Sequence, residues 1–367
     1  MPASAIPSSK GERSGSGLVW VSIADFFVST DRFVKARFCV ADVGTITCRA
    51  IFEAVYRQKP AIAPGSSMHR HAVKTVVNFL NRNPLSRAAK NFRNGMLDAM
   101  FRARDSERGR AFAQELPQSA RDGLCVTIAF NTPWVIDILT AGWLRYSSGM
   151  TLLVADNSLD EKARQSIKAI CDARGIPYLA LPPNPEWSPN RSHGIAMNWV
   201  HYNVIRHLRP TVFGYIDHDC LPIAPIDIPS LMEGKSVHGL ARSEERPLGT
   251  APWALWAGYC FFRFSSVEAL PLDFKHRIEW LLDTGGGNWN ALFRHLGPED
   301  ILEARRQDCT LSFAGIEATH EVFDDAVLHL GGASYFGNFS RSDYRKLLSD
   351  HIWDTYLGGR ADRLLAP

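Results

Sequence analysis

The sequence lacks an uninterrupted apolar run near the roughly 18 residues that a membrane-spanning helix needs. Its most apolar early segment, residues 18–28, is interrupted by Asp25. The opening residues 1–17 are small and polar, without the apolar middle of a secretion signal. These absences predict a chain that stays in the cytoplasm.

Cysteines at metal-binding spacing are also missing. The seven cysteines are scattered, with no C-x-x-C pair and no clustering with histidines at zinc spacing. Their odd number and scatter predict reduced thiols in or near the core. There is no repeat of fixed period. A composition of 46% hydrophobic and 22% charged residues is ordinary for a globular enzyme and argues against a disordered, collagen-like or coiled-coil chain.

Charge is unevenly distributed. Residues 1–120 carry 18 Lys/Arg against 9 Asp/Glu, so the net charge of +3 leaves the remainder acidic. We expect a disordered lead over 1–17 and a basic, mainly helical region over 18–120, without a recognisable nucleic-acid-binding domain. A helix predicted from Pro84 to about Arg104 is basic and amphipathic, and it packs on a neighbour or lies on an anionic membrane surface. Its apolar positions recur at three- or four-residue steps: Leu85, Ala88, Phe92, Met96 and Met100.

From Leu124 onward, short apolar runs alternate with helical segments, which is typical of βαβ units and a mainly parallel sheet. We expect a catalytic domain over 121–340, followed by a C-terminal helix and tail over 341–367. The predicted strands are 125–130, 151–155, 178–181 and 211–216. The predicted helices are 133–146, 160–174, 194–208 and 343–357.

Polar residues follow three of these strands. In open α/β sheets ligands bind beyond the carboxyl ends of the strands, so Asn131, Asp156 and Asp217 should gather on one rim. Asp217 and Asp219 are two apart in extended chain and point to the same side, while His218 faces away. Carboxylate oxygens suit Mg²⁺ or Mn²⁺, which would neutralise a diphosphate.

Chance alone gives about one Asp-x-Asp in a chain of this length, so its position after a strand matters more than the tripeptide. The alternative is a turn with two solvated aspartates.

The sequence resembles the family 2 type glycosyltransferases of the GT-A fold over about residues 124–335. The resemblance implies an α/β, Rossmann-like fold with a mixed, mainly parallel sheet flanked by helices, here with a helical N-terminal extension. It also implies inverting transfer of a sugar from a UDP- or GDP-type donor to a glycan or lipid-linked acceptor, as in polysaccharide biosynthesis. The matching segments are VTIAFNTP, LLVADNS, NRSHGIAMNWV, YIDHDC and LWAGYCFFRF.

By this resemblance Thr132 and Asp156 contact the nucleoside. Asn190, Gly194 and Asn198 lie beside the nucleotide, although Met197 stands where the family usually has a basic residue. From the residues alone, Asp156 is also a candidate helix cap or turn residue.

Arginine matches phosphate through its bidentate fork, so Arg191 and Arg242 are candidate diphosphate contacts. The commoner alternative is a surface position. Trp253 and Trp256 are candidates for stacking on a sugar ring, and Gly258 for close backbone approach to a ligand.

An inverting transferase needs a carboxylate that takes the proton of the acceptor hydroxyl. Asp283 is the first candidate, because it ends a predicted helical stretch before three glycines; Glu299 and Asp300 resemble the family's acidic pair and come second. Each of these acids is equally explained as a helix cap. By resemblance His329 is a third metal ligand, and the alternative is a hydrogen-bonded structural histidine.

The sequence thus predicts a metal-dependent glycosyltransferase. Two alternatives remain: a nucleotidyltransferase that makes sugar nucleotides, and a catalytically silent binding module for carbohydrate or nucleotide. Peripheral contact with the inner membrane surface is an additional expectation.

Overall fold

The computed structural model describes residues 83–186, 188–242, 251–277, 280–333 and 343–365. Residues 84–367 form one compact unit. The expected lead over 1–17, and the basic region as far as residue 82, lie outside the described residues. No described helix is both long enough and apolar enough to cross a bilayer.

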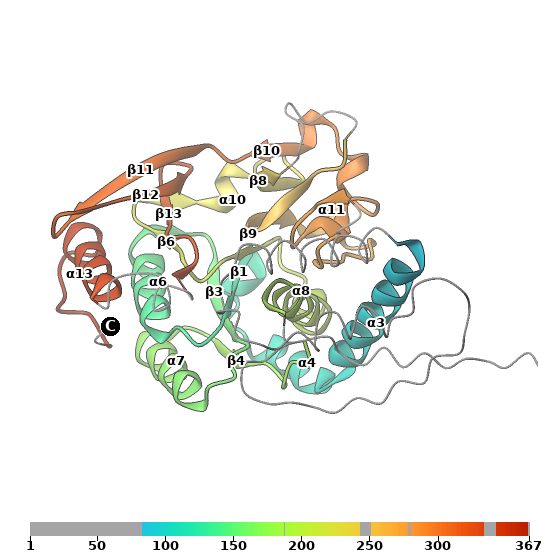
Figure 1. Cartoon of the computed structure of the whole chain (residues 1–367), viewed down its shortest axis with the longest axis horizontal. Coiled ribbons are helices and arrows are strands. Elements are labelled where there is room, and N and C mark those ends of the chain that lie inside the picture. Colours follow the sequence, from blue (N-terminus) through green and yellow to red (C-terminus); the bar gives the residue numbers. More distant parts are fainter. Residues whose placement is uncertain (1–82, 187, 243–250, 278–279, 334–342, 366–367) are drawn as a thin grey trace, which may run out of the picture. The chain divides into compact units, whose positions relative to one another are not determined.

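A seven-stranded sheet lies at the centre of this unit, in the order β10-β8-β9-β5-β1-β3-β4 (Figure 1). Strand β9 pairs antiparallel with both β5 and β8, and every other pairing is parallel. The predicted α/β architecture, with a mixed, mainly parallel sheet flanked by helices, is confirmed. The strands are β1 (Gly123–Ala129), β3 (Thr151–Asp156), β4 (Tyr178–Ala180), β5 (Val212–Ile216), β8 (Val237–Arg242), β9 (Ala254–Arg263) and β10 (Ile301–Glu303).

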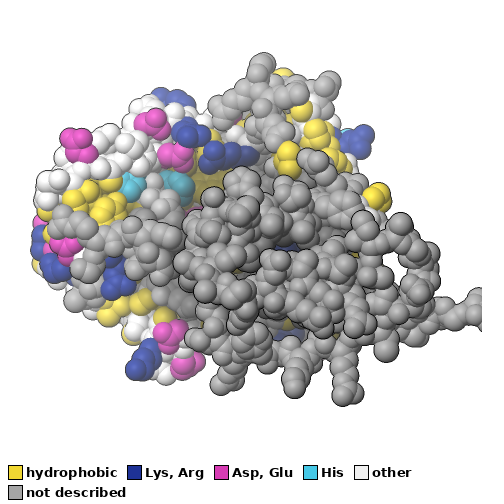
Figure 2. Space-filling view, viewed as in Figure 1, with side chains coloured by type: hydrophobic (Ala, Val, Ile, Leu, Met, Phe, Trp, Pro, Cys, Tyr) yellow, Lys and Arg dark blue, Asp and Glu magenta, His cyan; other side chains and the backbone are white. Residues whose placement is uncertain are grey.

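A second, four-stranded sheet has the order β11-β12-β13-β6, and β2 pairs with β7. The long β11–β12 hairpin carries acidic and basic side chains interspersed on its outer surface (Figure 2). These strands are β2 (Ser147–Ser148), β6 (Cys220–Pro222), β7 (Ile226–Asp227), β11 (Arg306–Phe313), β12 (Ile316–Phe323) and β13 (Val327–His329).

Helices cover both faces of the central sheet. On one side lie α6 (Pro133–Tyr146), α7 (Glu161–Arg174) and α13 (Tyr344–Tyr356); on the other lie α3 (Pro84–Ala103), α4 (Ser106–Glu115) and α8 (Pro189–Val200). The side chains of β1 alternate between these two faces. Cys125 and Ala129 pack toward α6, whereas Leu124 and Val126 pack toward α8. A strand buried on both faces reads as a continuous apolar run.

Several short helical turns complete the unit. They are α5 (Ser119–Asp122), η1 (His201–Ile205), α9 (Arg206–Leu208), α10 (Ile228–Leu231), α11 (Phe264–Val267), η3 (Gly286–Asn288), η4 (Phe293–His295) and η5 (Pro298–Asp300).

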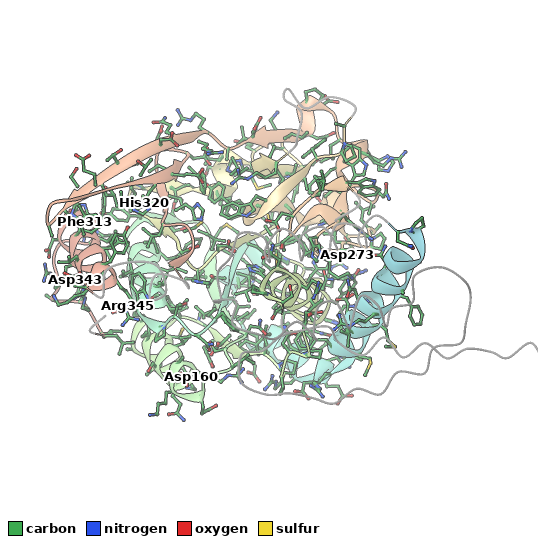
Figure 3. All side chains as sticks on the ribbon, in the orientation of Figure 1. Asp160, Asp273, Phe313, His320, Asp343 and Arg345 are labelled. Carbon is green, nitrogen blue, oxygen red and sulfur yellow. The ribbon has the colours of Figure 1, made fainter. Side chains whose placement is uncertain are left out.

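Element ends follow local chemistry. Helix α7 begins after Asp160, whose carboxylate accepts a 2.9 Å hydrogen bond from the Lys162 N–H, and it ends at Gly175 with φ of 62° (Figure 3). The helix predicted over 194–208 instead starts at Pro189, because proline fits the first helical turn, and it loosens into the π-helix η1.

Helix α3 exists as predicted but its apolar stripe faces outward. Phe92, Met96 and Met100 are 75%, 48% and 63% exposed. The charged side chains turn inward, since Arg93 pairs with Glu186 at 3.2 Å and Arg102 pairs with the buried Asp98 at 3.3 Å. The expectation that this stripe packs on a neighbour is therefore wrong for Phe92, Met96 and Met100. The inner face of α3 is held by ion pairs and by Phe101, which is buried in the core.

Candidate metal and donor site

Asp217 and Asp219 lie where β5 ends, on the rim formed by the carboxyl ends of β1, β3 and β5. The Asp217 N–H donates a 2.9 Å hydrogen bond to the Gly258 carbonyl of β9. Its own carbonyl accepts a 2.9 Å bond from the Cys220 N–H, which turns the chain. His218 points elsewhere, with Nδ1 3.3 Å from the Ile128 carbonyl of β1.

The Asp217 carboxyl is poorly satisfied by protein groups. Its Oδ1 is buried and has no hydrogen-bond partner among the described residues, and His193 Nε2 lies 3.6 Å away. Burial, followed by the negative charge of Asp219, raises the pKa of Asp217 to about 7. About 24% of the side chain is exposed, so water moderates this effect. Such an oxygen is costly to bury, and a cation would satisfy it.

Gly258 makes room for this carboxylate. A Cβ at Gly258 would lie 2.6 Å from Asp217 Oδ2 and would also overlap the Trp256 ring. The glycine therefore permits a close approach, as expected, but the group that comes close is a side chain of the site itself.

His329 completes an acidic and imidazole cluster. Its Nε2 lies 3.9 Å from Asp219 Oδ1, and its Nδ1 lies 3.2 Å from Glu321 Oε2. The other oxygen of Asp219 accepts a 3.1 Å bond from the Ala333 N–H. With Nδ1–H donated to Glu321, the lone pair of His329 Nε2 is directed to the Asp219 side. Among the described residues, the ligand atoms that lie within 4.8 Å of one another belong to Asp219, Cys220 and His329, and Asp217 stands outside this group. Asp219 and His329 thus lie together as the predicted donor set for Mn²⁺ or Mg²⁺ requires, whereas the metal role of Asp217 stays a prediction.

The two glycines that follow β13, Gly331 and Gly332, are needed for their backbone conformation. Their φ values are 68° and 70°, in the left-handed region that favours glycine, so they turn the chain directly after β13.

Three residues of this site escaped sequence reasoning: His193, Cys220 and Glu321. Cys220 lies directly opposite His329 because β6 pairs with β13, a pairing between two three-residue strands that no sequence pattern reveals. His193 lies in the segment NRSHGIAMNWV, but the sequence alone indicates no function for it. Burial lowers its pKa to about 4, while the charges of Asp283 and Asp219 oppose this, so it is a neutral imidazole among carboxylates.

Asp283 borders the same site. Its Oδ1 accepts hydrogen bonds from Asn190 Nδ2 at 3.1 Å and from the Thr284 N–H at 2.8 Å. It lines a cavity of about 520 Å³ together with Ser188, Pro189, Asn190, Arg191, His276, Leu281 and Leu282. The helical stretch predicted before Asp283 is wrong, since Arg277 and Leu282 form an antiparallel bridge and Leu281 has φ of 55°.

The three glycines after Asp283 let backbone segments approach one another. Gly285 has φ of 99°, and a Cβ there would lie 2.6 Å from the Leu255 carbonyl of β9. Gly287 lies against the backbone of Asp273, a residue that also pairs with Lys275 at 3.2 Å (Figure 3). This packing fixes the loop that carries Asp283.

The residues expected to contact the nucleoside are engaged with protein groups. The Thr132 hydroxyl donates to the Phe130 carbonyl at 3.1 Å. Asp156 is fully buried; its Oδ1 accepts from the Ser158 N–H and its Oδ2 from the Tyr178 hydroxyl, both at 2.8 Å. Asp156 is thus a turn residue and not a cap of α7. Asp156 has no exposed surface, so a direct nucleoside contact would require the groups around it to move.

Residues of α8 are divided between the site and the core. Asn190 reaches Asp283, as described above, whereas Asn198 is buried and bonds to Asp98 and Asp273 at 2.9 and 3.1 Å. Gly194 packs on the Lys275 backbone, and Arg191 pairs with Glu186 at 3.1 Å. Of these four expected nucleotide contacts, Asn198 is too deep for a ligand.

Aromatic rings extend from the metal cluster along the rim. The Trp256 ring lies 4.8 Å from the His329 ring, and the Arg242 guanidinium lies 5.5 Å from the Trp256 ring. Arg242 thus contacts a ring that itself lies against His329, and its role as a diphosphate contact stays a prediction. Trp253, in contrast, is buried against Phe293.

Glu299 and Asp300 lie at the opposite rim of the sheet. Asp300 accepts bonds from the Ser236 hydroxyl at 3.0 Å and the Gly297 N–H at 3.1 Å, just before the start of β8. Because β8 and β5 run in the same direction, this is the amino end of the strands. Their candidate role as acceptor base is therefore wrong, and Asp300 acts as the turn and cap residue of η5.

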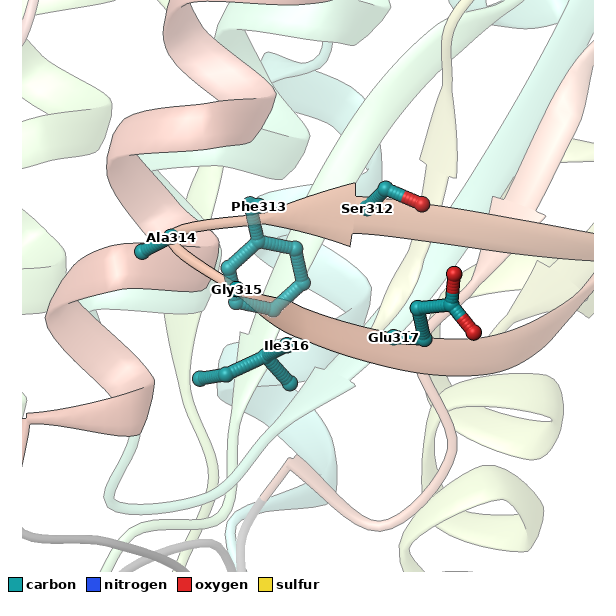
Figure 4. A pocket seen from close by; sticks show the side chains of 6 residues that line it. All are labelled: Ser312, Phe313, Ala314, Gly315, Ile316 and Glu317. Carbon is teal, nitrogen blue, oxygen red and sulfur yellow. The ribbon is translucent and has the colours of Figure 1, made fainter.

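A further hollow of about 590 Å³ lies at the β11–β12 turn (Figure 4). It is lined by Phe313, Ile316 and their neighbours, with Glu317 as its one charged group. Phe313 stacks on His351 of α13, so this hollow is a structural junction without the chemistry of the rim.

Comparison with known proteins gives only distant structural likenesses. No protein-family model matches the sequence, and no curated protein matches it. Among solved structures, the mannosyltransferase PcManGT from Pyrobaculum calidifontis, in complex with GDP-Man and Mn²⁺, is 11% identical with a TM-score of 0.30, over 49% of this chain and 56% of that one. TarS of S. aureus is 11% identical with a TM-score of 0.29, over 42% and 30%. An active-site mutant of LgtC is 13% identical with a TM-score of 0.33, over 49% and 72%. The matched region thus covers less than two thirds of the length of PcManGT and of TarS.

Proposed function

We propose that this protein is a metal-dependent glycosyltransferase that moves a sugar, with inversion, from a UDP- or GDP-type donor to a glycan or lipid-linked acceptor. The observations that carry the proposal are at the carboxyl rim: His329 Nε2 lies 3.9 Å from Asp219 Oδ1, and Asp217 has a buried carboxylate oxygen that no described protein group satisfies. Three donors of this kind leave positions for phosphate oxygens on a Mn²⁺ or Mg²⁺ ion.

The residues around the proposed metal site have separate roles in binding the cation and the phosphates. The carboxylates of Asp217 and Asp219 hold the cation, and Glu321 keeps the His329 ring in the orientation that directs Nε2 to it. When bound, the cation supplies a Lewis acid that neutralises the departing diphosphate. Arg242 lies beyond Trp256, where it would contact the same phosphates.

Asp283 is the proposed base. As the acceptor oxygen attacks the anomeric carbon, its proton passes to the Asp283 carboxylate, and the bond from that carbon to the diphosphate oxygen breaks. Asn190 and the Thr284 N–H hold the carboxylate toward the 520 Å³ cavity, which we propose receives the acceptor. Thr132 and the turn at Asp156 would border the nucleoside on the other side.

Donor hydrolysis tests this function. UDP- and GDP-sugars are incubated with and without Mn²⁺, and release of the nucleoside diphosphate is measured for the wild type and for Asp219→Asn. We expect Mn²⁺-dependent release that the variant loses while its melting temperature without metal is retained. Equal release by both proteins would contradict the proposal.

The same assay separates the two alternatives. Pyrophosphate release from a nucleoside triphosphate and a sugar phosphate would identify a nucleotidyltransferase. Calorimetric binding of UDP and Mn²⁺ without turnover of any donor would identify a silent binding module.

We also propose a cytoplasmic protein in peripheral contact with the inner membrane surface through α3. The exposed Phe92, Met96 and Met100 would enter the lipid boundary, and the inward ion pairs of Arg93 and Arg102 predict that salt weakens this binding little. Vesicle co-sedimentation of wild type and Phe92→Asp tests this, and equal binding by both would exclude α3.

A further inference from the structure

Cys220 adds a soft ligand to the hard donors of the rim. One ligand atom each from Asp219, Cys220 and His329, namely a carboxylate oxygen, the thiol sulfur and a ring nitrogen, all lie within 4.8 Å of one another. The order of the strands explains this arrangement, because Cys220 of β6 is the direct antiparallel partner of His329 of β13. Side chains of directly opposed residues lie on the same face of a sheet.

This trio has a chemistry different from that of the Asp217, Asp219 and His329 set. Oxygen-rich sets suit Mn²⁺ and Mg²⁺, whereas sulfur and imidazole together suit zinc-like ions. Zn²⁺ takes bonds of about 2.0–2.3 Å to oxygen, nitrogen and sulfur, which puts tetrahedral ligands roughly 3.3–3.8 Å apart. The trio therefore needs to contract by about 1 Å, a movement that side-chain torsions can supply.

The surroundings prepare the trio for a cation. Glu321 holds His329 Nδ1 at 3.2 Å, and the Ala333 N–H holds one oxygen of Asp219 at 3.1 Å, so the other oxygen and Nε2 are directed inward at 3.9 Å from each other. Cys220 has no exposed surface, and Asp219 and His329 are mostly buried, so water competes little for the ion.

We propose that Asp219, Cys220 and His329 bind Zn²⁺ as a tridentate site that excludes the Mn²⁺ mode used for sugar transfer. This inference rests on the proposed function only in its consequence, which is the loss of sugar transfer. The two binding modes share Asp219 and His329, whereas Cys220 would bind only Zn²⁺ and Asp217 only Mn²⁺. Binding replaces the Cys220 thiol proton, which leaves to solvent, and a water or phosphate oxygen fills the fourth position. Zinc is then an inhibitor that competes with Mn²⁺.

Two variants separate the modes. Cys220→Ser should weaken Zn²⁺ binding by about tenfold or more and should keep Mn²⁺ binding, because only the soft ligand is lost. Asp217→Asn should do the opposite. Cys125→Ser, which changes a buried thiol of β1, is the matched control for removal of a cysteine from the core.

The experiment titrates the full chain with Co²⁺, a spectroscopic substitute for Zn²⁺, and separately with Mn²⁺ followed by paramagnetic resonance. We expect a thiolate-to-cobalt charge-transfer band in wild type, Asp217→Asn and Cys125→Ser, displaced by added Zn²⁺ and missing in Cys220→Ser. If Cys220→Ser folds poorly, Cys220→Ala replaces it, with circular dichroism as the check. A cobalt spectrum that is unchanged without the thiol, or no thiolate band in wild type, overturns the proposal.

The same measurements distinguish a failure of the zinc site from a failure of the proposed glycosyltransferase function. A wild-type protein that shows the thiolate band but turns over no nucleotide sugar would keep the zinc site and lose the glycosyltransferase. Turnover that Zn²⁺ inhibits no better in wild type than in Cys220→Ser would keep the glycosyltransferase and overturn the inference.

Discussion

Two pairs of acids lie at opposite rims of the same sheet, and they differ in how the protein satisfies them. At the amino end, each Asp300 carboxylate oxygen accepts a hydrogen bond from a neighbouring protein group. At the carboxyl end, Asp217 Oδ1 is buried without such a partner in the described part of the chain, and it is subject to the negative charge of a second carboxylate, Asp219. A satisfied acid stabilises a turn, whereas an unsatisfied one costs stability and indicates a ligand.

The largest contrast is expected between Asp219→Asn and Asp300→Asn. Loss of a metal ligand should lower Mn²⁺-dependent donor hydrolysis by about 100-fold or more, because several kcal/mol of charge stabilisation are removed. Asp300→Asn should leave turnover within about threefold and cost about 1–2 kcal/mol of unfolding free energy through its lost hydrogen bonds. Steady-state rates and urea denaturation measure both. Similar losses of turnover in the two variants would erase the distinction between the rims.

Asp283 and Glu299 provide the second contrast. Asp283→Asn should lower kcat by about 10²–10⁴-fold, the usual effect of removing a general base, while the Mn²⁺ affinity stays that of the wild type. Glu299→Gln is the matched control at the other rim and should change neither quantity. Retention of wild-type kcat by Asp283→Asn would exclude it as the base.

The third contrast tests whether Glu321 supports metal binding by orienting His329. Glu321→Gln should weaken Mn²⁺ binding by about 10–100-fold, as is usual when a partner that orients a metal ligand is lost. Paramagnetic resonance of free Mn²⁺ measures this without any turnover. Glu317→Gln, on the same strand at the hairpin turn, is the control. An unchanged affinity in the Glu321 variant would mean that His329 needs no support.

The last contrast concerns stability and not turnover, and its residue is His201, a buried histidine of η1. Burial lowers its pKa to about 3, so the folded protein keeps it neutral while the unfolded chain protonates near pH 6.5. Stability should therefore fall as pH decreases from 6.5 toward 3, by at most about 1.4 kcal/mol per pH unit from this group. Denaturation of His201→Phe at several pH values should show a shallower slope. An identical slope in both proteins would assign the acid sensitivity elsewhere.

Much of this architecture follows from the sequence because its signals are local. A buried parallel strand reads as an apolar run, so β1, β3 and β5 were located within two residues of each end. Asp160 and Gly175 mark the ends of α7 through hydrogen bonding and a left-handed φ, both of which depend on neighbouring residues. The position of Asp217 at a strand end follows from the same logic.

Other expectations were wrong because they depended on remote partners. The apolar stripe of α3 faces outward because remote groups engage the other side of the helix: Glu186 pairs with Arg93, and Phe101 packs in the core. Glu299 and Asp300 were assigned by their position along the chain, which does not reveal the rim they occupy.

The sequence by itself determined the class of sheet and the point where two aspartates leave a strand, since both are set by side chains a few residues apart. Only the tertiary structure decided which groups meet those aspartates. His193, Cys220, Glu321 and His329 come from four separate elements, and the antiparallel pairing of β6 with β13 brings Cys220 and His329 together. Contacts between distant segments depend on how whole elements pack, and packing leaves no local pattern in the sequence.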